Sequence, residues 1–140
     1  MIGCMLNDSY TVNKADMAKL ISMEDDREEI IIPEQITVEE ESYPVAYIRK
    51  NTLRDREELQ SVIMGENIIA IVKNAFRGDS QLKNIELTGS VIRIGKNAFN
   101  GIAKDAVFRI RASEEDFERV VALIKAAGVE ETVVFERIDP

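Results

Sequence analysis

Residues 71–78 read Ile-Val-Lys-Asn-Ala-Phe-Arg-Gly, and residues 94–101 read Ile-Gly-Lys-Asn-Ala-Phe-Asn-Gly. A weaker copy of the Lys-Asn-Ala-Phe core stands at Lys50–Leu53. The three copies are equally spaced, since 73 − 50 and 96 − 73 both equal 23. A fixed period of this size is typical of solenoids, in which copies of one supersecondary unit stack on one another. The repeat therefore predicts a solenoid and argues against an enzyme built around a single deep pocket.

The rest of the repeat keeps the same period. When the copies are aligned on Lys73, five positions are apolar throughout, except that Asp105 replaces the leucine expected in the last copy. These positions hold Leu59 and Leu82; Val62, Ile85 and Phe108; Met64, Leu87 and Ile110; Ile68 and Val91; and Ile48, Ile71 and Ile94. Such alternation predicts short strands whose alternate side chains are buried. Gly78 and Gly101 follow the Ala-Phe turn, where we expect a left-handed backbone, and Asp55 takes this position in the first copy.

The repeated pattern Ile-x-x-x-x-Ala-Phe-x-Gly-x-x-x-Leu-x-x-Ile-x-Leu resembles the BspA-like branch of the leucine-rich-repeat proteins. Residues 71–78 and 94–101 carry the resemblance directly. Flanking segments that resemble the usual β-hairpin start and helical end of such repeats are residues 10–12, 30–33, 43–45, 101–108 and 127–129. The resemblance implies an α/β-type, β-rich solenoid. This would be a short leucine-rich-repeat coil stack with 23-residue repeats, an N-terminal β-hairpin cap, and a C-terminal cap of a helix and a strand.

The length of 140 residues and the apolar content of 45% predict one domain, residues 1–140. Its expected parts are an N-terminal β cap with an irregular first coil (1–48), the repeats (49–112) and a C-terminal helix and strand cap (113–140). In the first part we expect strands at Tyr10–Val12, Leu20–Met23, Glu29–Ile32, Gln35–Val38 and Tyr43–Ile48. Ile30 and Ile32 align with Val62 and Met64, which places them in the first coil.

The C-terminal part carries the signals of one helix. Ser113 precedes three acidic residues, and this combination predicts a helix start. Apolar residues at helical spacing follow, and Gly128 is expected to end the helix. The last strand is expected at Thr132–Phe135.

The charge balance excludes some partners. There are 18 basic and 26 acidic residues, which gives a net charge of −8. This argues against a nucleic-acid partner, because phosphate binding needs clustered Lys and Arg. No stretch approaches the roughly 18 consecutive apolar residues of a membrane span. Lys50, Lys73 and Lys96 form one stripe along the turns, which is either a solvated edge or a site for phosphate anions.

The chain lacks the usual catalytic and metal-binding residues. Cys4 is the single cysteine and there is no histidine, so we expect no metal, no cofactor and no enzyme activity. Acidic turns at Asp25-Asp26 and Glu39–Glu41 lack the ligand spacing of a calcium loop. Residues 1–4 resemble the end of a bacterial lipoprotein signal. The charged and hydrophobic regions that precede such a cysteine do not stand in this chain, so we interpret Cys4 as an ordinary residue.

Between the buried strand positions, the remaining side chains point to the open, concave side of the coil. The residues expected to bind a partner there are Ile31, Ile63, Asn84, Glu86, Arg109 and Arg111. In this alignment Glu86 lies beside Arg109, which predicts a cross-strand ion pair. The alternative is that this face is simply the surface of a sheet.

Asn51, Asn74 and Asn97 form another column at the same period. This column predicts amide side chains that satisfy backbone groups in successive tight turns. A row of amides that contact a ligand is the alternative.

These patterns favour a non-catalytic, monomeric module that binds another protein through its concave face. The resemblance implies a surface or secreted bacterial protein with an adhesion-type role. No export signal or anchor is visible in this chain, so the compartment stays open. The alternatives are a structural spacer without its own ligand and a small carboxylate-based hydrolase.

Overall fold

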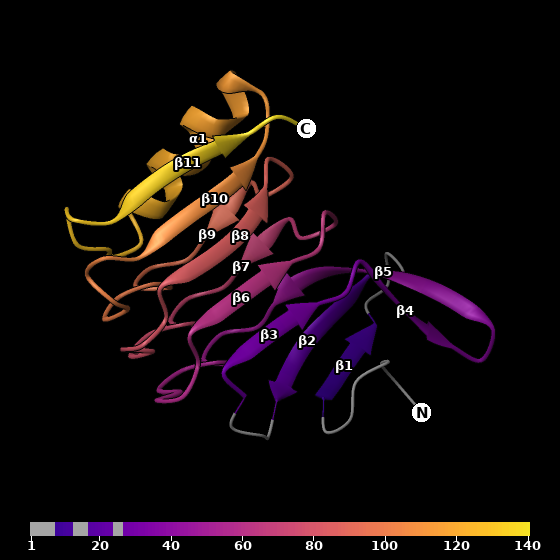
Figure 1. Ribbon diagram of the computed structural model, residues 1–140. Helices are drawn as coiled ribbons and strands as arrows, with labels where there is room; N and C mark the ends of the chain where they lie inside the picture. The colour runs from indigo at the N-terminus through magenta and orange to yellow at the C-terminus, as the bar shows by residue number, and fades with distance from the viewer. Residues whose placement is uncertain (1–7, 13–16, 24–26) are drawn as a thin grey trace.

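The computed structural model describes residues 8–12, 17–23 and 27–140, and its backbone winds into coils that stack along one axis (Figure 1). Each coil contributes one strand to a five-stranded, entirely parallel sheet. Its strands, in spatial order, are β3 (Glu29–Ile32), β6 (Ser61–Met64), β8 (Asn84–Thr88), β10 (Val107–Arg111) and β11 (Val134–Ile138). Residues one repeat apart are directly opposite, as Val62, Ile85 and Phe108 are. The expected solenoid is confirmed.

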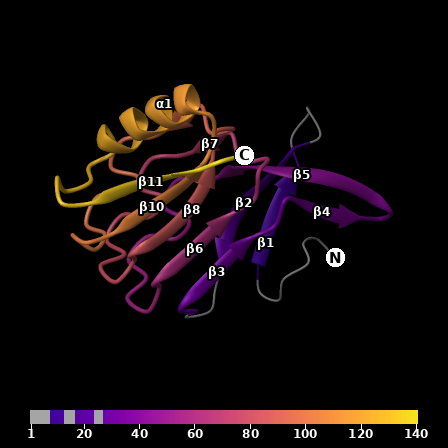
Figure 2. The same cartoon turned by 45° about the horizontal axis from the view of Figure 1, so that its top comes forward.

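A second sheet runs along the other side of the coils. Its path is β1 (Asp8–Val12), β2 (Ala18–Met23), β5 (Glu41–Ile48), β7 (Ala70–Ile71) and β9 (Arg93–Ile94). β1, β2 and β5 were each expected to begin two residues later, at Tyr10, Leu20 and Tyr43. β7 and β9 were not predicted, because two residues are too few to show alternation. β4 (Gln35–Val38) pairs with β5 as a hairpin that projects from the N-terminal end of the stack (Figures 1 and 2).

The interior between the sheets is a continuous apolar stack. The Phe76 and Phe99 rings are parallel, with 5.2 Å between their centroids. Phe108 meets Phe99 edge to face, and Phe135 stacks on Phe108, so aromatic contact continues to the last strand. At the repeat position where Asp105 replaces the expected leucine, Leu59 and Leu82 are buried. Asp105 is exposed, as a charged residue at this position requires. Because truncation of one such ring typically costs about 3–5 kcal/mol, this column contributes a large share of the stability.

The turns of the coil depend on left-handed residues. Gly78 and Gly101 both have φ of 83°, and Asp55 in the equivalent position has φ of 58°, as expected. Asn74 also lies in this region, with φ of 58°, and Asn51 and Asn97 match it at 60° and 57°.

The asparagine column therefore works differently from our expectation. Successive turns are joined by hydrogen bonds between their backbones. One example is the Phe76 N–H, which donates to the Ala98 carbonyl of the next turn at 2.8 Å. For Asn51 the side-chain bond found is accepted from exposed Arg54. Asparagine is used here because it tolerates a left-handed backbone better than other non-glycine residues do.

Helix α1 (Glu114–Lys125) closes the C-terminal end of the stack (Figure 2). The Ser113 hydroxyl accepts the Asp116 N–H at 3.2 Å, which confirms the expected cap. Just after the helix, the Ala127 carbonyl accepts the Phe99 N–H at 3.2 Å and so takes the place of a further coil. Gly128, with φ of 95°, lies beyond the end of the helix, as expected.

The last strand differs from the expected Thr132–Phe135. It runs from Val134 to Ile138, because it pairs in parallel with the whole of β10. Thr132 lies before it, and its hydroxyl donates to the Lys104 carbonyl. The end of this strand was missed because Glu136 and Arg137 are charged, and charged residues are rare in a strand that is buried on both faces. β11 lies at the edge of the sheet, so these two side chains remain exposed.

Candidate functional site

The candidate site is the outward side of the five-stranded parallel sheet, which we call the strand face. The middle row of this face runs through directly opposed residues on all its strands. These residues are Ile31, Ile63, Glu86, Arg109 and Glu136. The row is apolar toward the N-terminal end of the stack and charged toward the C-terminal end.

The apolar end of the row exposes two isoleucines side by side. The side chains of Ile30 and Ile32 are buried, while that of Ile31 between them is 51% exposed. Ile63, directly opposite Ile31, is half-buried. The period of 2 along each strand causes this arrangement, because burying one set of side chains turns the other set outward.

The charged end differs from the expected Glu86–Arg109 ion pair. Glu86 and Arg109 are opposite one another in register, but the Arg109 Nε lies 3.7 Å from Glu136 Oε2 on the other neighbouring strand. Glu136 was missed because the predicted last strand ended at Phe135, three residues before the observed end at Ile138. In the structure, Glu86 is therefore left without that partner.

Three hollows lie along the strand face, where the strands reach their carboxyl ends, and all three share Thr88 and Arg111. The first, of about 340 Å³, is lined by Ile31, Pro33 and Ile63 among others. The second, of about 150 Å³, adds Glu86 and Ile138. The third, of about 460 Å³, continues toward the start of α1. We call this connected series the strand-end groove. The Arg111 guanidinium at its centre donates to the Asp139 carbonyl at 3.1 Å.

The structure brings four of the six expected site residues to this groove, namely Ile31, Ile63, Glu86 and Arg111. Asn84 and Arg109 belong to the same sheet face but lie outside these three hollows.

Two carboxylates at the groove were missed from the sequence. Glu34 and Glu66 both line the first hollow, just after β3 and β6 end. The Glu66 carboxylate raises the pKa of Glu34, because it accepts a hydrogen bond from the protonated form of Glu34 and repels the ionised form. The offset of 32 between them equals that between Ile30 and Val62. The alignment of the first coil already contained the signal that would have found this pair.

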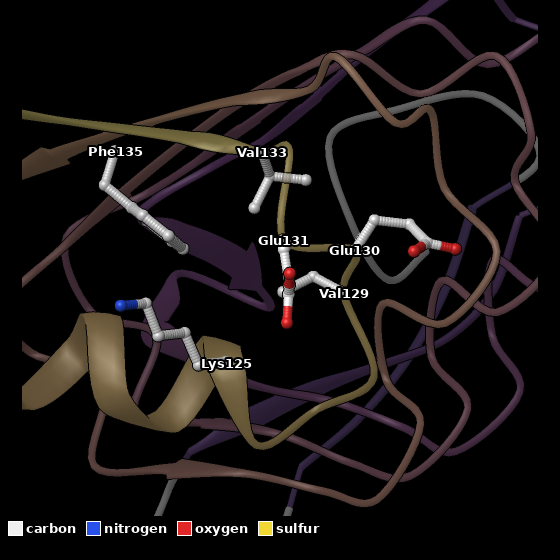
Figure 3. A pocket seen from close by; sticks show the side chains of 6 residues that line it. All are labelled: Lys125, Val129, Glu130, Glu131, Val133 and Phe135. Atoms are coloured by element: carbon white, nitrogen blue, oxygen red, sulfur yellow. The ribbon is translucent and has the colours of Figure 1, made fainter.

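A separate pocket of about 390 Å³ lies between the end of α1 and β11 (Figure 3). The Lys125 Nζ lies 5.8 Å from the centroid of the Phe135 ring, a cation–π contact. Glu130 and Glu131 also line this pocket, with Val129 and Val133 supplying apolar atoms. The Lys125 ammonium and the Phe135 ring contact one another, so the charged groups of this pocket that remain are the carboxylates of Glu130 and Glu131.

The remaining candidates from the sequence are exposed or lie elsewhere. Lys50, Lys73 and Lys96 are exposed, and a phosphate-anion site along this stripe stays a prediction. Glu39–Glu41 form an exposed turn, whereas Cys4 and Asp25-Asp26 lie outside the described residues. Within the described part of the chain, no group of three or more His, Cys, Asp or Glu residues could hold a metal ion. No helix among the same residues is long and apolar enough to cross a membrane.

One buried carboxyl stands apart from the strand face. Asp79 is fully buried in the turn after Phe76, and burial raises its pKa to about 8. Its Oδ1 accepts the Arg56 backbone N–H at 2.7 Å. Its Oδ2 has no hydrogen-bond partner in the described structure. The sequence contained a signal for this site too, since Asp79 aligns with buried Ile102 one repeat later.

Known structures share this architecture. A leucine-rich repeat protein from Bacteroides capillosus superposes with a TM-score of 0.69 at 18% identity, over 96% of this chain and 98% of that one. A leucine rich cell surface protein from Faecalibacterium prausnitzii gives a TM-score of 0.65 at 18% identity. That match covers 99% of this chain but only 43% of the other protein. At these identities the likeness establishes the fold.

The sequence itself matches one family model. The model for the BspA type leucine rich repeat region (6 copies) matches residues 46–117, which is 72 of 140 residues (117 − 46 + 1). No curated protein matches the chain. Leucine-rich repeats of this kind are typically not catalytic. The chain therefore belongs to the BspA-type leucine-rich-repeat family.

Proposed function

We propose that this protein is a non-catalytic module that binds another protein through its strand face. The observation that carries the proposal is the contiguous apolar area of Ile31 and Ile63 beside a groove. Exposed apolar patches rimmed by polar groups typically mark interaction sites, and solenoids use extended sheet faces for this purpose. Ile31, Ile63, Glu86 and Arg111 line the groove, while Asn84 and Arg109 extend the contact surface along the sheet.

A second part of the proposal concerns location. The F. prausnitzii protein with the same fold is described as a cell surface protein. We place this chain at a bacterial cell surface by analogy, as one module of an adhesion-type protein. Brief protease treatment of intact native cells tests this placement. Loss of the protein from intact cells supports it, and protection until the cells are lysed contradicts it.

The partner site is tested by a matched pair of double variants. Ile63→Glu with Arg109→Glu changes the strand face. Ile92→Glu with Arg93→Glu makes the same chemical change on the other sheet, where Ile92 is 66% exposed. The wild-type protein is used to capture a partner from native cells and their surroundings, and the affinity of that partner is measured with each variant.

The strand-face variant is expected to weaken binding by at least about fivefold, because loss of a dominant central contact of a binding surface costs over about 1 kcal/mol. The control variant should bind as the wild type does. Equal binding by both variants would remove the strand face as the site. Absence of any saturable partner would favour the spacer alternative.

A further inference from the structure

The strand-end groove has an apolar floor. Ile31, Pro33 and Ile63 line its first hollow, and Ile138 lines the second. These side chains come from the first, second and last strands of the sheet or directly follow them, and Thr88 of β8 and Arg111 of β10 line the groove between them, so the apolar residues lie toward its two ends. A partner that covers these apolar residues must offer apolar side chains, because only apolar contact compensates for the removal of water there.

The rim of the groove is negatively charged. Four carboxylates line the three hollows, namely Glu34, Glu66, Glu86 and Asp116, against the single guanidinium of Arg111. Asp116 pairs with Arg119 at 3.4 Å. Within the described residues, no ion pair is formed by Glu34, Glu66 or Glu86. Glu34 and Glu66 lie close enough together that Glu66 raises the pKa of Glu34, by hydrogen bonding first and by its like charge second.

We infer that the partner segment bound in this groove is cationic and amphipathic, with Lys or Arg side chains at Glu34, Glu66 and Glu86 and an apolar side chain against Ile31 and Ile63. This inference rests on the proposed function, since it names the chemistry of the partner at the same face. A cationic group between Glu34 and Glu66 relieves their mutual repulsion, so the free protein is prepared for it. An acidic or a purely apolar segment leaves that repulsion in place.

Two synthetic peptides serve as probes: acetyl-Lys-Leu-Lys-Leu-Lys-amide and acetyl-Glu-Leu-Glu-Leu-Glu-amide. They carry the same apolar residues and opposite charge. Binding is followed by NMR of isoleucine δ-methyl groups, with Ile31, Ile63 and Ile138 reporting on the groove. Ile92, exposed beside the other sheet, reports on nonspecific contact. The spectra are recorded at two salt concentrations, because contacts between exposed charges weaken as salt screens them.

The matched variants are Glu34→Gln with Glu66→Gln, and Glu130→Gln with Glu131→Gln. Both pairs remove two exposed carboxylates, and the second pair lies outside the groove. The basic peptide should shift the groove methyls saturably in the wild type and in the second variant. Its dissociation constant should rise roughly threefold to tenfold in the first variant, as expected for the loss of exposed ion pairs.

Several outcomes overturn the inference. One is equal binding of the basic peptide to both variants, and another is an equal shift of the groove methyls by the acidic peptide. A third is a shift at Ile92 as large as that at Ile63. In each case the proposed function is judged separately, by whether Ile63→Glu with Arg109→Glu still lowers the affinity for the native partner. If that affinity is also unchanged, both proposals fail.

Discussion

The rings of Phe76 and Phe99 lie parallel to within 2°, with their centroids 5.2 Å apart. These two residues occupy the same position in successive repeats, so one contact reports that the coils are in register. In the first two coils the same in-register arrangement, made by backbone pairing of β3 and β6, places Ile31 beside Ile63 on the strand face. The packed interior and the proposed site therefore both follow from the register of the coils.

Phe99→Ala should lower the free energy of unfolding by about 3–5 kcal/mol, because Phe99 contacts both Phe76 and Phe108 and is fully buried. Urea denaturation measures the change. Ile92→Ala, at an exposed position, serves as the control and should change stability by less than about 0.5 kcal/mol. A loss at Phe99 no larger than that of the control would contradict a tightly packed column.

Asn74→Ala should destabilise the protein by about 1–2 kcal/mol, since alanine carries the full cost of a left-handed backbone. Asn74→Gly should be close to neutral, because glycine adopts this conformation without that cost. Thermal melting of both variants separates the two explanations for the asparagine column. If glycine destabilises as much as alanine does, the amide side chain is required and our interpretation of the backbone is wrong.

Asp79→Asn should stabilise the protein increasingly as pH rises from about 4 to 8. The folded-state pKa of Asp79 is raised from 3.8 to about 8. In this window the folded protein keeps the proton while the unfolded chain releases it. Stability attributable to this group is therefore greatest below the unfolded pKa. It falls by up to about 1.4 kcal/mol per pH unit until the folded pKa is reached.

Denaturation at pH 5 and pH 8 checks this prediction, with Asp105→Asn, at an exposed position, as the control. The Asp79 variant should exceed the wild type by more at pH 8 than at pH 5. A constant difference between the two pH values would mean that Asp79 is ionised in the folded protein.

Glu39→Asn with Glu40→Gly should stabilise the hairpin and the protein by roughly 1–2 kcal/mol. These residues form the two-residue turn between Val38 and Glu41, with φ of 50° and 70°. Asn-Gly suits two positive φ angles far better than two glutamates do. Glu39→Gln with Glu40→Gln removes the same charges and keeps the strain. If the melting temperature of this control rises equally, charge repulsion is the cause.

Arg119→Gln should destabilise the C-terminal cap. The guanidinium donates to the carbonyls of Gly89 and Val91, each at 2.6 Å, and so joins α1 to the preceding coil. Its loss should cost about 1–3 kcal/mol, as charge-assisted bonds to backbone typically do. Hydrogen exchange should show faster opening of α1, whereas Arg93→Gln, at an exposed position, should leave α1 unchanged. Unaltered exchange in α1 would show that the helix is held by other contacts.

The treatment of residues 1–140 as one domain remains a prediction that limited proteolysis can test. The buried apolar residues form a cluster that extends from Tyr10 to Val133. Cleavage should be confined to termini and exposed turns such as Glu39–Glu40, with no stable fragment of 49–112 alone. A protease-resistant fragment lacking residues 1–48 or 113–140 would contradict the assignment.

The repetitive part of the fold could be predicted from the sequence because residues 23 positions apart lie next to one another in successive coils. The buried strand positions and the left-handed turn at Gly78 were predicted in this way, whereas the cap at Ser113 was predicted from the residue types of a helix start. Features that carry neither signal were missed in part or entirely. The strand after Val133 has two adjacent charged residues, Glu136 and Arg137, at a sheet edge, and the strand at Ala70 is too short to show a pattern.

The candidate site was predictable in part for the same reason. Register alone placed Ile31 beside Ile63. Register does not determine which of two neighbouring strands a long charged side chain contacts. The prediction that Arg109 pairs with Glu86 was therefore wrong, and its partner is Glu136. The Glu34–Glu66 pair keeps the same offset as Ile30 and Val62, but it lies just after the two strands end, beyond the strand positions to which the prediction was confined.

Photo-cross-linking from single cysteines tests most directly whether the strand face is the partner side. In a Cys4→Ser background, Glu86→Cys carries the label in the middle row of the strand face, and Lys73→Cys carries it on the exposed turns. The captured partner should cross-link through position 86 and not through position 73. Cross-linking through position 73 alone would show that the partner binds the turns of the coil, and the strand face would no longer be the site.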